Sequence, residues 1–324
     1  MQRWLDGLGH RDYRLAPASE DASFRSYLRL ESDGASFIVM DAPPDKEPCD
    51  SFIAVAAMLR TAGLSAPEVM EQNLEEGFLL LTDFGNDSYL SRLNASTAPE
   101  LYRDALDAIH AMQANIETQE LPAYDEALLQ REMDLFHDWF LNRLFEIELD
   151  SSQQSEWQQV KTRLVANALE QPQFFVHRDF HSRNLMRLQT HNPGILDFQD
   201  AVRGPVTYDL VSLLRDCYID WPLAQVEQMA LEFHRRAHEE GRVEVGAEQF
   251  MRWFDRMGLQ RHLKAIGIFS RLCIRDGKQG YLKDIPRTYS YVVEVCRRDE
   301  AMAPLFDLIS ALDLGDLVGE LGSL

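Results

Sequence analysis

The sequence predicts an α+β fold, with a small strand-rich part in residues 1–84 and a larger, mostly helical part in residues 85–324. Two observations lead to this prediction. Apolar and polar residues alternate over residues 22–30, a period typical of a half-buried strand, and residues 36–40 form its predicted partner strand. From about residue 85 onward the patterns are mainly helical, interrupted by a few short apolar runs.

The elements of the first part follow in order along the chain. Residues 33–34 (Asp-Gly) predict the turn of a hairpin between strands 22–30 and 36–40. Residues 50–62 predict a helix, with its N-cap at one of its first two residues and Gly63 past its end. The apolar run at residues 78–81 predicts a buried strand.

Charge and composition exclude several classes of partner. The net charge of −21 argues against nucleic acids and anionic membranes, because both require a basic surface. The four cysteines show no metal-site or paired spacing, so we expect a reduced, cytoplasmic compartment. No apolar core follows the first residues to indicate a signal peptide, and no apolar run is long enough to span a membrane. We also expect a monomer.

Residues 177–184 (HRDFHSRN) and 195–198 (ILDF) form the most informative pattern in the chain. It places Asp179, Asn184 and Asp197 in a fixed order, as phosphoryl transfer from ATP with Mg²⁺ requires. One carboxylate accepts the proton of the attacking hydroxyl, while an amide oxygen and a second carboxylate hold the metal. Asp179 is therefore the predicted catalytic base, and Asn184 and Asp197 are the predicted Mg²⁺ ligands.

Short apolar runs at 173–176 and 194–196 predict buried strands that lead into the two halves of this pattern. Strand ends present side chains from a rigid scaffold, which suits a catalytic site. A polar loop followed by an unrelated strand would explain a bare His-x-Asp. It would not explain the full set of residues at this spacing.

The pattern H-x-D-x-H-x-x-N over 177–184, followed by Asp197, resembles the signature of the aminoglycoside phosphotransferase and choline kinase superfamily. This resemblance implies a protein-kinase-like fold of two lobes. Residues 1–84 would form the β-rich, nucleotide-binding N-lobe, and residues 85–324 the C-lobe with the catalytic loop, metal site and acceptor site. It also implies that His177 orients the catalytic loop and that Asp209 accepts backbone hydrogen bonds from it.

The same resemblance implies where ATP binds. Residues 20–25 would cover the phosphates, although this segment lacks glycines and also fits an ordinary hairpin turn. One face of strand 37–40 would line the nucleotide, and residues 82–85 would form the hinge that contacts adenine. The expected nucleotide-contacting residues are Ser23, Phe24, Arg25, Ile38, Met40, Thr82 and Phe84.

A lysine expected on the strand beside the phosphates is absent. Met40 occupies its position, and helix 52–59 lacks the glutamate that would pair with it. Both partners are missing together, which leaves no unpaired buried charge. Arg25, Arg29 or Lys46 could supply the positive charge instead, although each also suits a solvated strand face or loop.

Four residues are candidates for contact with the acceptor: Glu132, Asp200, Arg203 and Arg215. Helix 131–140 mixes carboxylates with aromatic residues, which suits a sugar but also suits plain helix packing. The two arginines could pair with a substrate carboxylate or with surface acids. The sequence alone does not decide between acceptor binding and these structural roles.

A closer resemblance covers segments of both lobes, including residues 21–25, 39–44, 176–185, 194–201 and 204–210. These segments resemble the bacterial anomeric kinases that act on N-acetylmuramate and N-acetylglucosamine. The resemblance implies ATP-dependent phosphorylation of the anomeric hydroxyl to a 1-phosphate, in the recycling of peptidoglycan sugars. The alternatives are a kinase of another small acceptor (an aminoglycoside, a choline-like alcohol or a fructosamine) and a nucleotide-binding pseudokinase that regulates a partner.

Overall fold

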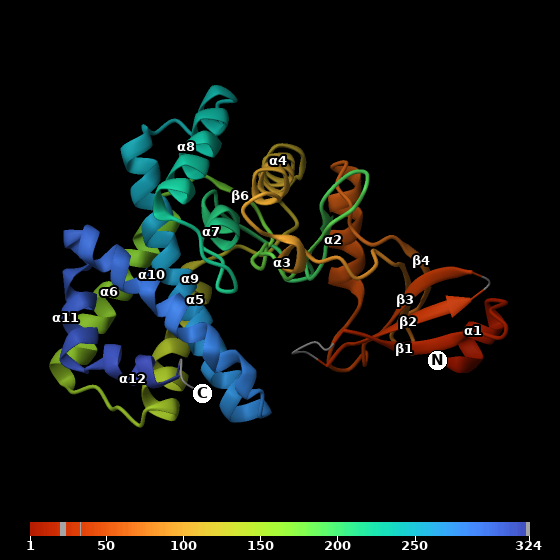
Figure 1. The fold of residues 1–324 in the computed structure, drawn as a ribbon, viewed down its shortest axis with the longest axis horizontal. Helices are drawn as coiled ribbons and strands as arrows, with labels where there is room; N and C mark the ends of the chain where they lie inside the picture. The colour runs from red at the N-terminus through yellow and green to blue at the C-terminus, as the bar shows by residue number, and fades with distance from the viewer. Residues whose placement is uncertain (20–23, 33, 322–324) are drawn as a thin grey trace. The chain divides into compact units, whose positions relative to one another are not determined.

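The computed structural model describes residues 1–19, 24–32 and 34–321 (Figure 1). It divides into two compact units. The first consists of Met1–Ile116 and Arg183–Ala201, and the second of Glu117–Ser182 and Val202–Leu324. The chain thus passes from one unit to the other directly after Ser182, inside the predicted catalytic segment. The predicted lobe boundary at residues 84 and 85 falls within the first unit and stays a prediction.

The first unit contains an antiparallel sheet in the order β1-β2-β3-β5-β4. Figure 1 shows β1, β2 and β3 side by side. The strands are β1 (Arg14–Ser19), β2 (Ser26–Ser32), β3 (Ala35–Asp41), β4 (Val69–Asn73) and β5 (Phe78–Thr82). The strands predicted from alternation and from the apolar run correspond to β2, β3 and β5. The predicted hairpin turn includes Asp33, which lies outside the described residues.

In its described residues, the first unit also contains four helices and a short hairpin. They are α1 (Gln2–Gly7), α2 (Asp50–Thr61), α3 (Tyr89–Arg92), α4 (Ala98–Asn115), β7 (Leu185–Met186) and β8 (Gly194–Ile195). The N-cap of α2 is Cys49, one residue before the first of the two predicted positions, Asp50. Gly63 follows the helix with φ of 83°, a left-handed conformation that glycine adopts at little cost.

The second unit is mainly helical. Its helices are α5 (Glu126–Leu135), the π-helix η1 (Phe136–Leu144), α6 (Ser151–Leu169), α7 (Tyr208–Leu214), α8 (Leu223–Glu239), α9 (Ala247–Asp276), the 3₁₀-helix η2 (Gln279–Asp284), α10 (Ile285–Arg298), the 3₁₀-helix η3 (Glu300–Met302), α11 (Ala303–Ala311) and α12 (Leu314–Leu321). A two-stranded antiparallel ladder joins β6 (Gln173–Val176) to β9 (Val202–Pro205). The strand predicted at residues 173–176 is thus present with the predicted bounds. The helix expected over residues 131–140 changes from α to π geometry at Phe136.

Helix α9 forms the centre of the second unit, where it packs on α5, η1, α7 and α10. Gly267 allows one of these contacts. A Cβ atom at this position would lie 2.3 Å from the carbonyl carbon of Leu135, where α5 ends, so any other residue would collide with that backbone. Among the described residues, none of the helices is long and apolar enough to cross a membrane.

Candidate active site

The predicted catalytic loop begins where β6 ends, and α7 holds it in place. Asp209, in the first turn of α7, is almost fully buried. Its carboxylate accepts hydrogen bonds from the backbone N–H groups of His177 (2.7 Å) and Arg178 (3.1 Å). These two bonds satisfy loop donors that would otherwise be buried without acceptors. The supporting role predicted for Asp209 is confirmed.

Further hydrogen bonds fix the loop around Asp179. The backbone N–H of Asp179 donates to Nδ1 of the buried His177 at 3.2 Å, which confirms the orienting role predicted for that histidine. The N–H of His181 donates to the carbonyl of Asp179 at 3.0 Å. The N–H of Ser182 donates to the carboxylate of Asp216 at 2.9 Å. Sequence reasoning missed Asp216, which lies just after the end of α7.

Arg178, the residue before Asp179, has a left-handed backbone with φ of 77°. This conformation costs free energy for a residue with a Cβ atom and persists only where its surroundings enforce it. Its backbone N–H is bound by Asp209, and its guanidinium is bound by Glu132. The backbone conformation that leads into Asp179 therefore depends on contacts of both the backbone and the side chain of Arg178.

Positive charges surround the carboxylate of Asp179. Burial alone would raise its pKa, but nearby cations outweigh burial and lower the pKa to about 2. Lys264 has the largest effect of these cations, followed by His181, Arg261 and Arg178. Asp179 is therefore ionised across the physiological range, as a carboxylate that accepts a proton must be.

Behind the loop lies a buried cluster of charged and polar side chains, here termed the Glu132 cluster: Tyr124, Glu132, Arg178, Gln260 and Lys264. Glu132 is 5% exposed, and its Oε1 accepts from Arg178 and lies 3.1 Å from Nζ of Lys264. Its Oε2 accepts from Tyr124 and, at 3.1 Å, from Gln260. Although burial raises the pKa of Glu132, Lys264 and Arg178 lower it overall, so the cluster contains an ionised carboxylate.

The predicted metal ligands lie on the β7–β8 hairpin of the first unit. The N–H of Leu196 donates to the carbonyl of Asn184 at 2.9 Å, which holds the two arms together. Nδ2 of Asn184 lies 3.1 Å from Oδ2 of Asp197, so the two side chains are adjacent. Oδ1 of Asp197 accepts from Gln199 at 2.9 Å. Phe198, between the last two residues, packs its ring 4.8 Å from that of Phe52 on α2.

The donors at this hairpin fit Mg²⁺. A neutral amide oxygen and a carboxylate are hard oxygen ligands, and Mg²⁺ commonly takes one or two protein ligands together with substrate phosphates. The described residues contain no cluster of three or more His, Cys, Asp or Glu side chains that would hold a metal by themselves. A cation at Asn184 and Asp197 would therefore depend on a phosphate-bearing ligand.

The expected nucleotide contacts differ in their surroundings. Met40 is fully buried in β3, and Ile38, two residues earlier, is partly exposed. Phe24 is 62% exposed, with Nζ of Lys46 4.4 Å from its ring centre. Nη2 of Arg25 lies 2.7 Å from a carboxylate oxygen of Glu47, just before α2. Ser23 lies outside the described residues.

The predicted hinge, residues 82–85, makes contacts with neighbouring parts of the first unit. The backbone N–H of Thr82 already donates to the carbonyl of Glu68 at 3.1 Å. Contact of Thr82 and Phe84 with adenine stays a prediction. The Phe84 ring lies against Gly194, where a Cβ would approach it to 2.7 Å. Gly85 has φ of 81° and turns the chain as expected.

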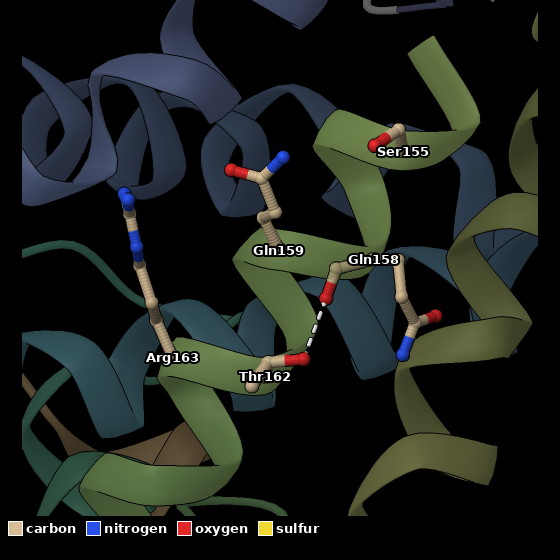
Figure 2. Close-up of a pocket in the computed structure, with 5 residues that line it drawn as sticks. All are labelled: Ser155, Gln158, Gln159, Thr162 and Arg163. Atoms are coloured by element: carbon tan, nitrogen blue, oxygen red, sulfur yellow. Dashed lines mark hydrogen bonds between the residues drawn. The ribbon is translucent and has the colours of Figure 1, made fainter. Parts of the chain in front are cut away.

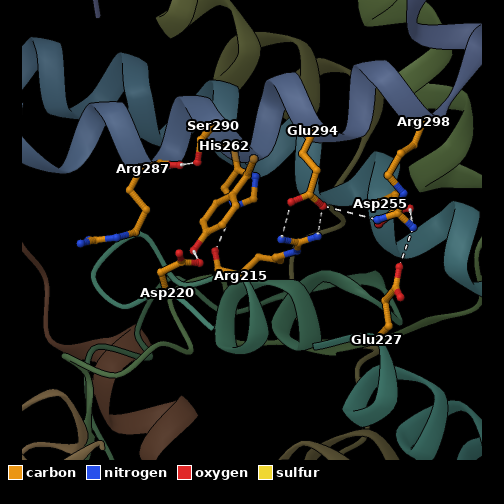
Figure 3. Close-up of polar contacts among 10 residues, drawn as sticks. Arg215, Asp220, Glu227, Asp255, His262, Arg287, Ser290, Glu294 and Arg298 are labelled. Carbon is orange, nitrogen blue, oxygen red and sulfur yellow. Dashed lines mark hydrogen bonds and ion pairs between the residues drawn. The ribbon is translucent and has the colours of Figure 1, made fainter. Parts of the chain in front are cut away.

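The four candidates for acceptor contact lie in contrasting environments. Asp200 and Arg203 are exposed. Arg215 is 4% exposed, and its Nη2 lies 2.6 Å from Oε1 of Glu294. Figure 3 shows the guanidinium of Arg215 directed at this carboxylate, within a network that reaches Arg298. A role for these residues in acceptor binding stays a prediction.

Figure 2 shows a hollow on the surface of α6, lined by Ser155, Gln158, Gln159, Thr162 and Arg163. The hydroxyl of Thr162 donates to the carbonyl of Gln158 within the helix at 2.9 Å. None of the predicted site residues lines this hollow. It is therefore not a candidate for the active site.

Residues 14–252 match the model of the phosphotransferase enzyme family. The chain belongs to this family. The match includes the catalytic loop, the β7–β8 hairpin and Asp209, so the phosphotransferase function predicted from the motif is confirmed. The acceptor of such an enzyme is a hydroxyl group.

Among curated proteins, this phosphotransferase is 46% identical to the N-acetylmuramate/N-acetylglucosamine kinase of Pseudomonas aeruginosa, over 93% of this chain and 89% of the relative. It is 40% identical to the protein of the same name from Neisseria meningitidis serogroup B, over 98% and 96%. Among solved structures, it resembles ADP-bound aminoglycoside phosphotransferase APH(2'')-Ib with a TM-score of 0.59, 13% identity, and coverage of 91% and 97%. The predicted protein-kinase-like fold is confirmed.

Proposed function

We propose that this phosphotransferase uses ATP to phosphorylate the anomeric hydroxyl of N-acetylmuramate and N-acetylglucosamine, and that it serves the recycling of cell-wall sugars. The observation that carries this proposal is the 46% identity to a kinase named for these two sugars, which extends over 93% of the chain. The fixed and ionised Asp179 supplies the chemistry that such a reaction needs.

In the proposed reaction, Asp179 accepts the proton of the anomeric O–H group as the sugar oxygen attacks the γ-phosphorus. The new O–P bond forms in line with the bond that breaks, and ADP leaves with that electron pair. The protein contributes mainly position and electrostatics to this step. The hydrogen bonds that Asp209, His177 and Asp216 make with the loop backbone support this role for Asp179.

Asn184 and Asp197 are the residues proposed to hold Mg²⁺. The cation, when bound with ATP, would neutralise charge on the phosphate oxygens. Gln199 donates to one oxygen of Asp197 and leaves the other directed at Asn184, which supports a shared ligand there. Asp179 and Asn184 lie in one short segment of chain, so the proposed base is close in sequence to one of the two proposed metal ligands.

Arg25 is the proposed substitute for the absent strand lysine. In protein kinases a lysine on β3 pairs with a glutamate and contacts the phosphates. Here a buried arginine at the end of the segment predicted to cover the phosphates is paired with Glu47 at 2.7 Å. A guanidinium oriented by a carboxylate suits phosphate recognition.

The experiment that tests the function is an ATP-consumption assay with Mg²⁺ on N-acetylmuramate, N-acetylglucosamine, kanamycin and choline, with phosphorus NMR of the products. We expect turnover on the two amino sugars and a signal of a sugar 1-phosphate. Turnover only on kanamycin or choline would contradict the proposed substrate, while the assignment of the protein as a phosphotransferase would stand. Nucleotide binding without turnover on any acceptor would favour a regulatory protein.

A further inference from the structure

We propose that Glu132 is a positioning residue for phosphoryl transfer, which acts by holding the side chain of Arg178 and thereby the backbone that presents Asp179. This inference rests on the proposed function of Asp179 as the catalytic base. It gives Glu132 a role different from binding the hydroxyl groups of the acceptor.

The first step of the argument is that both oxygens of Glu132 are already engaged. One oxygen faces the guanidinium of Arg178 and the ammonium of Lys264, and the other accepts from Tyr124 and Gln260. The residue is nearly inaccessible to solvent. A carboxylate with this number of partners has little remaining capacity for a substrate hydroxyl.

The second step concerns the backbone of Arg178. Its left-handed conformation reverses the chain between β6 and Asp179, and it is unfavourable for arginine without support. Asp209 holds the backbone N–H, while Glu132 holds the far end of the side chain. Release of the guanidinium would remove one of these two supports and let Asp179 move relative to its productive position.

The third step concerns charge. The titratable groups that act on Asp179 come from the loop itself, from α7 and from α9: Arg178, His181, Tyr208, Asp209, Arg261 and Lys264. Glu132, on α5, is the carboxylate that pairs with two of the cations. Without it, Asp179 would be a nearby counter-charge for both Arg178 and Lys264. A salt bridge to Asp179 would occupy the lone pairs that must accept the proton.

The test is the variant Glu132→Gln, which keeps the size and shape of the side chain. We expect kcat to fall roughly 100-fold, as a small misplacement of a catalytic group can cause. The KM for ATP should stay within roughly twofold, because the effect is on position rather than nucleotide binding. The control is Glu126→Gln, which changes an exposed carboxylate on the same helix, and it should leave kcat unchanged.

A double-mutant cycle with Arg178→Met shows whether Glu132 acts through Arg178. We expect the double variant Glu132→Gln/Arg178→Met to be no slower than the slower single variant, because both changes remove the same support. If the two losses in kcat multiply, the two residues act independently and the inference is wrong.

Glu132→Gln leaves two buried cations without their carboxylate, so it could fail to fold. The variant Glu132→Gln/Lys264→Met removes one anion and one cation together and should fold, while still depriving Arg178 of the negative charge that holds it. A folded double variant with wild-type kcat would overturn the inference. Absence of amino-sugar turnover in the unmodified protein would instead overturn the proposed function, so the two failures are distinguishable.

Discussion

Arg29 on β2 holds the carboxylate of Asp83 through two N–H groups, with Nε 2.6 Å from Oδ2 and Nη2 3.1 Å from Oδ1. The same guanidinium donates to the carbonyl of Gly85 at 3.0 Å and to Oδ1 of Asn86 at 2.6 Å. Arg29 is thus committed to the segment after β5, the predicted hinge. Arg29, one of the cations considered for the ATP phosphates, is therefore already engaged by several acceptors.

Loss of this contact should loosen the hinge. We expect Arg29→Ala to cost about 1–3 kcal/mol of folding free energy, since it leaves a partly buried carboxylate without its charged donor. The KM for ATP should rise more than kcat falls. Chemical denaturation and steady-state kinetics measure the two effects. The control is Arg60→Ala, which breaks the exposed pair with Glu68 and should cost no more than about 1 kcal/mol.

Asp179→Asn should remove the proton acceptor and keep the shape of the loop. We expect kcat to fall roughly 100- to 10,000-fold, the range typical of a general base. Binding of ATP, measured by calorimetry, should change little. Asp138→Asn, at an exposed site on η1, is the control and should retain full activity. Wild-type turnover in Asp179→Asn would remove this residue from its proposed role.

Asp197→Ala should abolish the dependence of nucleotide binding on Mg²⁺. The carboxylate is the charged ligand in the proposed pair, and Asn184 alone offers a neutral oxygen. Calorimetry with ATP in the presence of Mg²⁺ and then of EDTA provides the measurement. We expect Mg²⁺ to tighten binding to the unmodified protein and to have little effect on the variant. If Mg²⁺ tightens ATP binding equally in both proteins, Asp197 is not a ligand of the metal.

His262 should make stability depend on pH. Its Nε2 lies 2.9 Å from the carbonyl oxygen of Arg215, and burial lowers its pKa to about 3. Because this value is below that of an unfolded histidine, the stabilising effect is complete above about pH 6.5 and is lost as pH falls. Between pH 6.5 and 4.5 the free energy of unfolding should drop by roughly 2–3 kcal/mol from this group.

His262→Gln keeps an amide donor for the carbonyl of Arg215 and cannot become charged. We therefore expect its stability to change less over the same pH range, as measured by denaturant titration at each pH. His191→Gln, which alters an exposed histidine, is the matched control and should retain the pH dependence of the unmodified protein. Equal pH dependence in His262→Gln and the unmodified protein would rule His262 out as the cause.

Two glycines of α9 should respond differently to alanine. Gly267→Ala would place a Cβ 2.3 Å from a backbone atom of Leu135, which must shift, so we expect a loss of about 1–3 kcal/mol or more. Gly258→Ala meets its nearest atom, on Val211, at 3.7 Å. There alanine should stabilise the helix by up to about 1 kcal/mol, because glycine is a poor helix former. Thermal unfolding of both variants is the measurement.

Local sequence was sufficient for the elements whose signals are contiguous. Alternation over residues 22–30 follows from the two-residue period of a strand, and the Asp-Gly pair after it predicts a hairpin partner, so β2 and β3 could be predicted. The catalytic loop could be predicted because its functional groups lie within a few residues of one another. The strand bounds at Gln173–Val176 were predicted for the same reason, whereas the role of Asp209 was implied by the resemblance to the kinase superfamily.

Only the tertiary structure decided which distant residues surround that loop. Glu132 and Arg178 are 46 positions apart in the chain, and Gln260 is 128 positions from Glu132. Sequence reasoning placed Glu132 at the acceptor and overlooked Lys264, because a charged residue on a helix has the same local pattern whether it faces solvent or a buried partner. Packing of α5 against α9 removes these side chains from water, and only then must each charge find a counter-charge. The sequence by itself therefore determined the reaction class, while the folded core decided how the carboxylate of Asp179, the proposed catalytic base, is held and kept ionised.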